Sequence, residues 1–513
     1  MEMTLTVGSL LAELPKARLV QGDPSASVLA IEHDSRQVEL GGLFVAIPGF
    51  STDGHAYLGG AITRGASAVL VQDDHEGAWR AIPHSVAVIA VPDTRIALSR
   101  AAAWFYGHPS REMTVIGITG TDGKTTTSHI LTAVLEAGRG VVGRLGTVDV
   151  YLPGEQSKVS NRMSTPEAPE VQRILRQMVD AGCGFAVVES TSHGLALHRL
   201  ADVEYDVAVV TNVTGDHLDF HKTFEAYREA KGMLFEALDH ESPKASGKVA
   251  VVNADDPSAD FFLARTSRGA PLRYGMETRE AEVLGRNVHL RADGTSFRLI
   301  TPEGSTETGL RMPALFNVYN ALAAASAALA CDIPLEAVGR GLLAAPGVPG
   351  RMERIIAGQP FEVIVDYAHT GDAVRKVLEV MRSVCRGRLM IVVGAAGDRD
   401  PGRRFGVGRA AAEGADFAVF TNEDPRSEDP GAIVREIARH ATDAGRVPGQ
   451  DFVEIEDRRA AIAEAFRRAG TGDVVVIAGK GHENSIVYGS KELPWDDREV
   501  AREELARLGF VNL

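Results

Sequence analysis

Short runs of aliphatic and β-branched residues recur along the chain, and polar residues follow directly after many of them. In the middle of the chain, helix-like stretches separate the runs 115–118, 185–188, 207–211 and 248–252. This alternation is typical of βαβ units in a mostly parallel sheet. Ligands bind outside the carboxyl ends of such strands, so the polar residues there are candidate site residues: Glu189, Asn212 and the run 253–256.

The same pattern predicts strands on both sides of this segment. They are expected at 43–47, 68–71 and 86–91 in the first part, and at 362–365, 389–393, 417–420 and 474–478 in the last part. Proline and glycine at 346–350 indicate a linker. We therefore predict an α/β fold with three domains, residues 1–108, 109–343 and 344–513. The central one is expected to hold a P-loop-type parallel sheet, and the C-terminal one a Rossmann-like, doubly wound sheet.

A glycine-containing turn at the end of the run 114–118 is the main chemical signal. The predicted strand leads into Gly120, Thr121, Asp122 and Gly123, and Lys124, Thr125 and Thr126 then open a helical pattern. Glycines let backbone N–H groups face phosphates, the lysine neutralises charge, and a threonine hydroxyl can reach Mg²⁺. The alternative is an ordinary tight turn, but the spacing of Lys124 and Thr125 favours a phosphate loop for ATP.

Two further places carry candidate metal chemistry. Thr125 and Glu189 are the oxygen ligands expected nearest to the phosphate loop, because Mg²⁺ prefers carboxylate, hydroxyl, water and phosphate oxygens. The run 211–221 contains two aspartates, two histidines and an asparagine after a strand. Its His217 would be an unusual ligand for a hard cation, so chemistry alone gives it a weaker role.

Charged residues also follow the predicted strands of the last domain. Arg399 and Arg426 can bind a carboxylate through their guanidinium groups. Glu423, Asp424 and Glu483 can hold an ammonium group. A ligand with both charges, such as an amino acid, fits this set.

Composition restricts the partners. The formal net charge of −15 argues against a nucleic-acid partner. Only three cysteines occur, and they are not clustered, which is typical of a reducing cytoplasm without a disulfide framework. No apolar run is long enough to span a membrane, so we expect a cytoplasmic protein without membrane insertion.

These features combine into one reaction class. A nucleotide triphosphate in the central domain, an amino acid in the last domain and a third component at the first domain suggest ATP-driven ligation. A carboxylate would be phosphorylated, and an amine would attack the acyl phosphate. Catalysis would then depend mainly on charge stabilisation and positioning.

At this point the chain resembles the Mur ligase family over essentially its full length. The stretches that carry the resemblance are Asp34-Ser-Arg36, Gly120-Thr-Asp-Gly-Lys-Thr-Thr126, Ser164-Thr-Pro166, Glu189-Ser-Thr-Ser-His-Gly194, Asp216-His-Leu-Asp219, Phe316-Asn-Val-Tyr-Asn320, Gly350-Arg-Met-Glu353, Asp366-Tyr-Ala-His369, Gly397-Asp-Arg-Asp400, Asp424-Pro-Arg426 and Gly479-Lys-Gly-His-Glu483. The last three stretches point to members that add the third residue of the peptide.

The resemblance implies a role for each domain. The N-terminal domain would bind the UDP part of UDP-N-acetylmuramoyl-L-alanyl-D-glutamate, the central domain ATP, and the C-terminal domain the incoming amino acid. Substrate-contacting positions would be Ser35, His55, Ser164, Thr165, Thr191 and Arg199; positions near the ATP base and ribose would be Asn320, Arg351 and Asp366; and Pro425 and Gly479 would join the amino-acid site.

The resemblance also implies a fuller metal and catalytic set. Glu189 and His217 fall on Mg²⁺-ligand positions, which overrides the weaker role that chemistry alone gives His217. Lys231 matches a lysine that family members carry as a carbamate, an anion able to complete a Mg²⁺ site. Lys124, Lys231 and His217 are therefore the predicted catalytic residues. Otherwise Lys231 would be a solvated charge on a helix.

Four positions depart from the family pattern. Asp122 stands in place of asparagine, Leu197 in place of a glutamine that contacts the peptide, and Gly371 in place of proline. Asp424 replaces the asparagine of the motif typical of diaminopimelate-adding enzymes. Its added negative charge suits a bare distal ammonium, as in L-lysine or L-ornithine, whereas Arg399 and Arg426 favour the distal carboxylate of meso-diaminopimelate, our first choice.

Two other functions compete with this one. One is another amide ligase of the same fold, such as a folylpolyglutamate synthase. The other is a catalytically silent homologue that acts as a scaffold, which the retention of Lys124, Thr125 and Glu189 argues against. We expect a monomer whose C-terminal domain swings about the linker at 344–350 when ATP binds.

Overall fold

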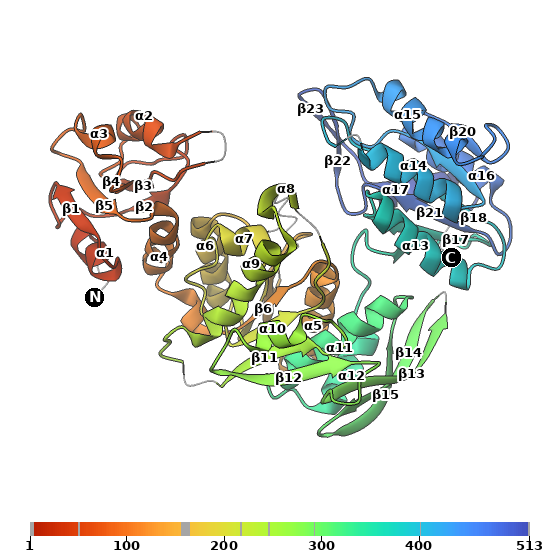
Figure 1. Ribbon diagram of the computed structural model, residues 1–513, viewed down its shortest axis with the longest axis horizontal. Coiled ribbons are helices and arrows are strands. Elements are labelled where there is room, and N and C mark those ends of the chain that lie inside the picture. Colours follow the sequence, from red (N-terminus) through yellow and green to blue (C-terminus); the bar gives the residue numbers. More distant parts are fainter. Residues whose placement is uncertain are drawn as a thin grey trace. The chain divides into compact units, whose positions relative to one another are not determined.

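A computed structural model describes residues 5–49, 52–154, 165–215, 218–244, 247–291, 293–400 and 402–510. Figure 1 labels the helices and strands of the chain, whose internal contacts divide it into two compact units. The first comprises 1–285, 299–306 and 319–342, and the second 286–298, 307–318 and 343–513. Within the described part of the chain, every helix is too short or too polar to cross a membrane. Ser164 and His217, two of the predicted site residues, lie outside the described residues.

The first unit opens with a five-stranded sheet. In spatial order its strands are β1 (Arg18–Gln21), β5 (Ala87–Val91), β4 (Ala68–Gln72), β3 (Gly42–Val45) and β2 (Ala30–Glu32). All neighbours are parallel except β1 and β5. The accompanying helices are α1 (Val7–Glu13), the short 3-10 helix η1 (Gly54–Tyr57), α2 (Leu58–Thr63), α3 (Glu76–Trp79) and α4 (Thr94–Phe105). Side chains of α1 and α4 pack on one face of the sheet, and those of α2 and α3 on the other.

A second, mostly parallel sheet carries the phosphate loop. In spatial order its strands include β12 (Gly269–Gly275), β11 (Lys248–Asn253), β10 (Val207–Val210), β6 (Thr114–Thr119), β9 (Phe185–Glu189), β7 (Val142–Leu145) and β8 (Val150–Tyr151). Only β7 and β8 among these are antiparallel. The central strands are buried along nearly their whole length, as expected for parallel strands covered by helices.

Helices alternate with these strands. They are η2 (Pro109–Glu112), α5 (Lys124–Arg139), α6 (Ala168–Asp180), α7 (Ser192–Ala196), α8 (Leu218–His221), α9 (Phe224–Glu236), η3 (Ala237–Asp239) and α10 (Ala259–Leu263). The amphipathic helices α6 and α9 contribute Leu175, Met178, Leu234 and Phe235 to the core on one face of the sheet. On α5, Val134 approaches Gly341 so closely that a Cβ on Gly341 would lie 2.5 Å from the Val134 Cα.

The chain then continues through three strands and two helices. The strands are β13 (Val283–Arg291), β14 (Gly294–Thr301) and β15 (Gly304–Leu310), and the helices are α11 (Leu315–Leu329) and α12 (Leu335–Ala344). β13 joins the sheet beside β12, where Val283 pairs with Tyr274.

The second unit contains the third main sheet. Its strands in spatial order are β16 (Glu353–Arg354), β17 (Glu362–Asp366), β21 (Val474–Ala478), β18 (Leu389–Val393), β19 (Phe417–Phe420) and β20 (Phe452–Glu454), with a separate hairpin of β22 (Ser485–Tyr488) and β23 (Lys491–Pro494). The helices are α13 (Gly371–Val384), α14 (Gly402–Gly414), α15 (Pro430–Asp443), α16 (Arg458–Arg468) and α17 (Asp497–Arg507). β16 is antiparallel to β17, and the other five strands are parallel.

Alternate residues of these strands enter two different cores. Ile364 and Ile391 face the helices α13, α14 and α15, whereas Val363 and Val392 face α16 and α17. The sheet is therefore covered on both faces, which confirms the predicted α/β class and the doubly wound C-terminal sheet. Aspartate side chains cap α15, α16 and α17 at their N-termini: Asp429, Asp457 and Asp496.

The predicted strands all occur, with small shifts at their ends. The hairpin β22–β23 and the short strands β16 and β20 were not predicted, because each strand is brief and has at most one buried side chain. The boundaries at 108 and 343 stay predictions.

Candidate active site

Two glycines give the turn after β6 a backbone that other residues would strain. Gly120 has φ +146° and Gly123 has φ +83°. A Cβ on Gly120 would lie 1.9 Å from the Thr211 Oγ1, and a Cβ on Gly123 would lie 2.2 Å from the Asn320 Oδ1. Both positions therefore require glycine, and the turn leads directly into α5 at Lys124.

The turn is fixed to the segment that follows β10. The Asp122 N–H donates to the Asn212 Oδ1 at 3.0 Å, and the Asn212 Nδ2 donates to the Asp122 carbonyl at 3.1 Å. The Thr211 hydroxyl donates to the same carbonyl at 2.6 Å. These bonds hold the backbone of Asp122 from two sides, so Asn212, a strand-end candidate, supports the loop.

Two lysines converge on the carbonyl of Gly120. The Lys124 Nζ donates to it at 2.9 Å and to the Thr121 carbonyl at 2.9 Å. The Lys231 Nζ donates to the Gly120 carbonyl at 2.7 Å and lies 4.3 Å from the centre of the Tyr227 ring. Lys231 is only 1% exposed, so the solvated-charge alternative for this residue is wrong.

Glu189 at the end of β9 is fully buried and receives four neutral donors. The Thr125 hydroxyl donates to its Oε2 at 3.0 Å and the Ser128 hydroxyl to its Oε1 at 3.2 Å. The Thr147 N–H and hydroxyl donate at 3.3 and 2.8 Å. A buried carboxylate beside the Thr125 hydroxyl at the end of a phosphate loop is an all-oxygen donor set, which fits Mg²⁺.

The other predicted nucleotide residues lie in different places. Thr126 is half-buried in the first turn of α5. Asn320 on α11 accepts from the Thr127 hydroxyl at 3.4 Å, next to Gly123. Arg351 and Asp366 belong to the second unit. Asp366 accepts the Met352 and Ala368 N–H groups at 2.7 and 2.8 Å, and burial raises the pKa of its carboxyl although Arg351 opposes this.

Two other candidate strand-end residues prove to be turn residues. Asp256 accepts the Val213 and Ser258 N–H groups at 2.8 Å each. Asp255 accepts three backbone N–H groups, at positions 276–278, and the Tyr319 hydroxyl at 2.9 Å. Their carboxylates satisfy backbone donors, so the interpretation of this run as part of a ligand site is not supported.

Thr165, Thr191 and Arg199 lie in one network at the start of α7. The Thr165 and Thr191 hydroxyls are 2.9 Å apart, and Thr191 caps α7 through the Gly194 N–H. Arg199 donates to the Thr165 carbonyl at 2.9 Å and forms an ion pair with Glu167 at 2.7 Å. The structure thus brings three of the predicted substrate residues together.

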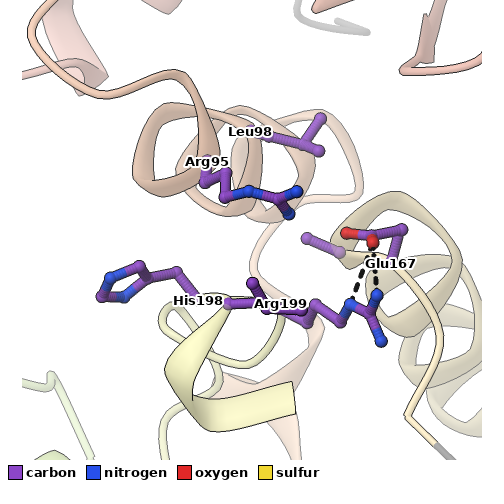
Figure 2. Close-up of a pocket in the computed structure, with 7 residues that line it drawn as sticks. Arg95, Leu98, Glu167, His198 and Arg199 are labelled. Atoms are coloured by element: carbon purple, nitrogen blue, oxygen red, sulfur yellow. Dashed lines mark hydrogen bonds and ion pairs between the residues drawn. The ribbon is translucent and has the colours of Figure 1, made fainter. Parts of the chain in front are cut away.

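A shallow pocket borders this network (Figure 2). Seven residues line it: Arg95, Leu98, Glu167, Ala168, Leu197, His198 and Arg199. The Arg95 guanidinium, from α4, points toward Glu167 in Figure 2 and donates to the Pro48 carbonyl at 2.7 Å. Leu197, one of the departures from the family pattern, contributes an apolar wall.

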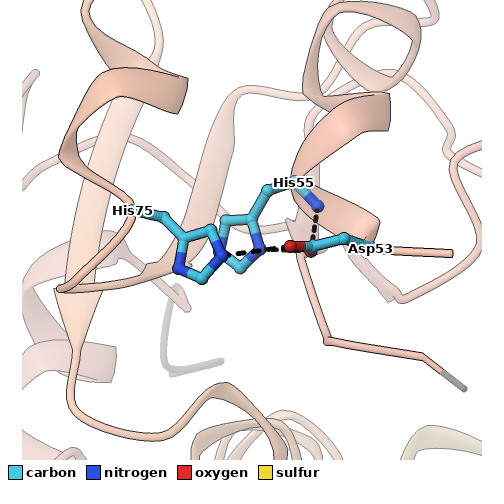
Figure 3. A group of neighbouring side chains, drawn as sticks. All are labelled: Asp53, His55 and His75. Carbon is cyan, nitrogen blue, oxygen red and sulfur yellow. Dashed lines mark hydrogen bonds and ion pairs between the residues drawn. The ribbon is translucent and has the colours of Figure 1, made fainter.

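His55 is buried against Asp53 and His75 (Figure 3). Its Nε2 accepts the Gln72 N–H at 2.9 Å, so the proton must sit on Nδ1, which donates to the Asp53 Oδ1 at 2.7 Å. His75 contacts the other Asp53 oxygen at 3.0 Å and stacks on the His55 ring at 4.1 Å. These three side chains are close enough to hold a metal ion, but a protonated His55 Nδ1 facing Asp53 cannot act as a ligand.

Ser35 lies half-buried in the turn that Asp34 and Arg36 close through an ion pair of 2.7 Å. This ion pair accounts for the two charged residues of the turn without a ligand. The role of Ser35 stays a prediction.

Two loops of the second unit lock together where the predicted amino-acid residues lie. The Gly397 N–H donates to the Asp424 carbonyl at 2.8 Å, and a Cβ on Gly397 would lie 2.1 Å from the Pro425 carbonyl oxygen. Arg426 has φ +52°, and the hairpin β22–β23 holds it there: its N–H donates to the Val487 carbonyl at 2.9 Å. Strained backbone of this kind concentrates at functional sites. Arg399 is exposed on the neighbouring loop.

Asp424 is paired inside the protein. The Lys480 ammonium, which is 1% exposed, donates to the Asp424 Oδ1 at 2.9 Å and to the Glu483 Oε2 at 2.5 Å. Burial opposes the charge on Lys480, but Glu483 and Asp424 outweigh it and raise the pKa of its ammonium. Asp424 is therefore held in an ion pair and is not a free charge, but one ammonium is shared by two carboxylates, so its effect on a distal ammonium stays a prediction.

Glu423 lies behind this pair and is 6% exposed. Its Oε2 would be 2.8 Å from a Cβ on Gly479, whose φ is +112°. Burial raises the pKa of its carboxyl to about 7, despite the opposing charges of Arg458 and Lys480. Its Oε2 is buried and has no hydrogen-bond partner within the described residues, and a direct role of Glu423 in binding an amino acid stays a prediction.

Several supporting residues escaped the sequence reasoning. Ser128 and Thr147 complete the shell of Glu189, and Tyr227 packs on Lys231. Lys480 belongs to the stretch 479–483 that carries part of the family resemblance, but its partner Asp424 lies 56 residues away in the sequence. The sequence offered one signal for Lys480, which is its place between two glycines after a predicted strand.

Comparison with known families agrees with this architecture. Three family models match in succession: the Mur ligase family catalytic domain over residues 28–106, the Mur ligase middle domain over 118–328, and the Mur ligase glutamate ligase domain over 350–481. Together they match a large part of each of the three main sheets.

Two relatives are similar over almost the whole chain. A UDP-N-acetylmuramyl-tripeptide synthetase of Roseiflexus sp. (strain RS-1) is 47% identical over 491 residues, 94% of this chain and 95% of that protein. A UDP-N-acetylmuramoyl-L-alanyl-D-glutamate–2,6-diaminopimelate ligase of Bacillus licheniformis is 40% identical, covering 97% of this chain and 99% of that protein.

A solved structure is similar as well. A UDP-N-acetylmuramoyl-L-alanyl-D-glutamate–2,6-diaminopimelate ligase has a TM-score of 0.70 and 29% identity, covering 99% of this chain and 100% of that chain. The fold and site thus define an ATP-dependent ligase of the α/β class. The chain belongs to the Mur ligase family.

Proposed function

We propose that this protein joins meso-diaminopimelate to UDP-N-acetylmuramoyl-L-alanyl-D-glutamate at the expense of ATP, in the synthesis of peptidoglycan precursors. The observation that carries the proposal is the meeting of Lys124 and Lys231 on the Gly120 carbonyl, beside the Thr125–Glu189 pair. The relatives named for this reaction support the choice of substrates. The reaction takes place in the cytoplasm, and the enzyme acts as a monomer.

The phosphate loop binds the triphosphate. Its backbone N–H groups and the N-terminus of α5 face the phosphates, and Lys124 turns from the loop carbonyls to neutralise them. Thr125, Glu189, His217 and a carbamate on Lys231 would hold Mg²⁺, which neutralises phosphate charge during transfer when it is bound.

Carbamylation explains why a lysine is buried at this place. The neutral Lys231 amine would add CO₂ and lose a proton, giving an anion on the same side chain. The Gly120 carbonyl and the Tyr227 ring hold its Nζ near the loop. Native mass spectrometry before and after acidification tests this: the wild type should lose the mass of one CO₂, and Lys231→Ala should not.

The chemistry proceeds in two steps. The γ-phosphoryl group passes from ATP to a carboxylate oxygen of the glutamyl residue, which releases ADP and forms an acyl phosphate. The amine of the incoming amino acid then attacks the acyl carbon, the C–O bond breaks, and inorganic phosphate and a proton leave. The residues of this chain contribute positioning and charge stabilisation.

The charge distribution of the second unit favours meso-diaminopimelate. Lys480 ties Asp424 into an ion pair that it shares with Glu483, whereas Arg426 and Arg399 can pair with a distal carboxylate. L-Lysine and L-ornithine lack that carboxylate. They remain the alternative substrates, because the relatives do not distinguish them.

A substrate panel tests both levels of the proposal. ADP release is measured with the UDP-muramoyl dipeptide and each of meso-diaminopimelate, L-lysine and L-ornithine, and separately with a folate and glutamate. We expect the highest kcat/KM with meso-diaminopimelate and none with folate. Highest turnover with lysine or ornithine would overturn the choice of amino acid, and turnover with folate alone would overturn the reaction.

A further inference from the structure

Three segments of the second unit meet around Tyr367. They are the linker end at 350–352, the segment 366–369 after β17, and the loop 479–483 after β21. A Cβ on Gly350 would lie 2.1 Å from the His482 backbone nitrogen, and a Cβ on Gly481 would lie 2.7 Å from the Tyr367 Cβ. The backbones are therefore in contact, so a shift of one segment displaces the other two.

The ring of Tyr367 is enclosed by charged and aromatic side chains. The Arg351 guanidinium carbon lies 4.5 Å from the ring centre, within cation–π distance. The rings of His369 and His482 lie 4.7 and 4.9 Å away. The Arg351 Nε is buried and has no hydrogen-bond partner within the described ranges, and its guanidinium lies against the tyrosine ring.

The hydroxyl of Tyr367 contacts Glu483, one of the predicted amino-acid-binding residues. It donates to the Glu483 Oε1 at 3.2 Å, while the Glu483 Oε2 accepts from Lys480, the partner of Asp424. Burial raises the pKa of the Tyr367 phenol, which keeps it a donor at neutral pH. One side chain thus contacts both a predicted nucleotide residue and a predicted amino-acid residue.

We propose that Tyr367 is a positioning residue that sets the orientation of both Arg351 and Glu483, so that ATP and the incoming amino acid bind cooperatively. The inference rests on the proposed function for the identity of the two ligands. The ring acts on Arg351 and the hydroxyl on Glu483, so the two halves of the coupling can be separated by mutation.

Two variants separate them. Tyr367→Phe keeps the ring and removes the hydroxyl; we expect the KM for the amino acid to rise about 5- to 20-fold, with the KM for ATP within about twofold. Tyr367→Leu removes both contacts; we expect both KM values to rise and the dependence of one on the concentration of the other substrate to disappear. Tyr151→Phe is the matched control, because that hydroxyl also donates to a carboxylate, Glu136, at 2.8 Å.

The outcomes distinguish this inference from the proposed function. Absence of wild-type turnover with any diamino acid would overturn the proposed function itself. If the wild type is active, two results for Tyr367→Phe would overturn the coupling. One is unchanged KM values, and the other is a loss of thermal stability with no change in KM. If Tyr367→Leu does not fold, the double variant Tyr367→Phe/Glu483→Gln replaces it: its KM for the amino acid should match that of Glu483→Gln alone, and fully additive increases would contradict the coupling.

Discussion

Two buried carboxylates lie at or after the ends of strands in two different sheets, and their partners differ in kind. Glu189, the last residue of β9, receives only neutral donors, from Thr125, Ser128 and Thr147. Asp424 after β19 receives the ammonium of Lys480 and the Val487 N–H at 3.0 Å. Hydroxyl donors leave the negative charge of Glu189 available to a cation, whereas Asp424 already has a cation, Lys480, which it shares with Glu483. Similar positions in the fold therefore have different surroundings: Glu189 is the proposed metal ligand, and Asp424 is tied to the loop that carries Lys480.

The largest effect is expected at Glu189. Glu189→Gln preserves the side-chain shape but removes the charge, so turnover should fall by about 10²–10³-fold or more. The measurement is kcat for ADP release over a range of Mg²⁺ concentrations. Ser128→Ala, which removes one neutral donor, is the matched control and should cost far less. Near-normal turnover of Glu189→Gln would remove this residue from the metal site.

The next effect concerns Lys480. Lys480→Met leaves Asp424 buried without its cation, and losing one partner of a buried pair costs about 3–5 kcal/mol of unfolding free energy. Urea denaturation of both proteins checks this value. The combined variant Lys480→Met/Asp424→Asn should recover much of the loss. If Lys480→Met alone were as stable as the wild type, the Lys480–Asp424 pair would not stabilise the folded protein.

Glu423 should give the stability of the protein a distinct pH dependence. Its folded-state pKa of about 7 lies above the usual value of 4.5, so its contribution is fully present below pH 4.5 and is lost as the pH rises through 7. This loss amounts to about 3 kcal/mol at most.

The comparison is made with Glu423→Gln, which cannot titrate. Denaturation at several pH values should show the wild type losing stability relative to the variant between about pH 4.5 and 7. Parallel curves for the two proteins across this range would show that Glu423 is charged or solvated in the folded state.

The smallest effect is expected at Asp424. Asp424→Asn still accepts the Val487 N–H, and Lys480 keeps Glu483 as its partner. We therefore expect a change of at most about fivefold in kcat/KM and an unchanged preference among the diamino acids. A reversal of preference, measured with the same panel of three amino acids, would show that the charge of Asp424 reaches the ligand.

The phosphate loop was predictable because its chemistry is local. The strand, the glycines and Lys124 stand within a dozen residues, and their spacing fixes their arrangement. Glu189 was predictable for a similar reason, since a polar residue at the end of a buried parallel strand meets the edge where ligands bind. Lys231 needed the family resemblance, because a lysine on a helix is usually solvated.

The amino-acid loops were predictable only in part. The sequence indicates that Arg399, Asp424 and Arg426 follow strands, and the structure locks their loops together. The sequence does not reveal that Lys480 pairs with Asp424, because this pairing depends on β21 and β19 lying on either side of β18. The hairpin that holds Arg426 was also missed, since four-residue strands with exposed side chains carry little pattern.

Omission of substrates tests the central claim most directly. The protein, Mg²⁺ and ATP are combined with the UDP-muramoyl dipeptide and meso-diaminopimelate, and ADP and the nucleotide-linked product are both quantified. The ligase reaction predicts one product molecule for each ADP, and sustained ADP release only when all three substrates are present. Equal ADP release without the amino acid, or ADP release without any tripeptide product, would contradict it.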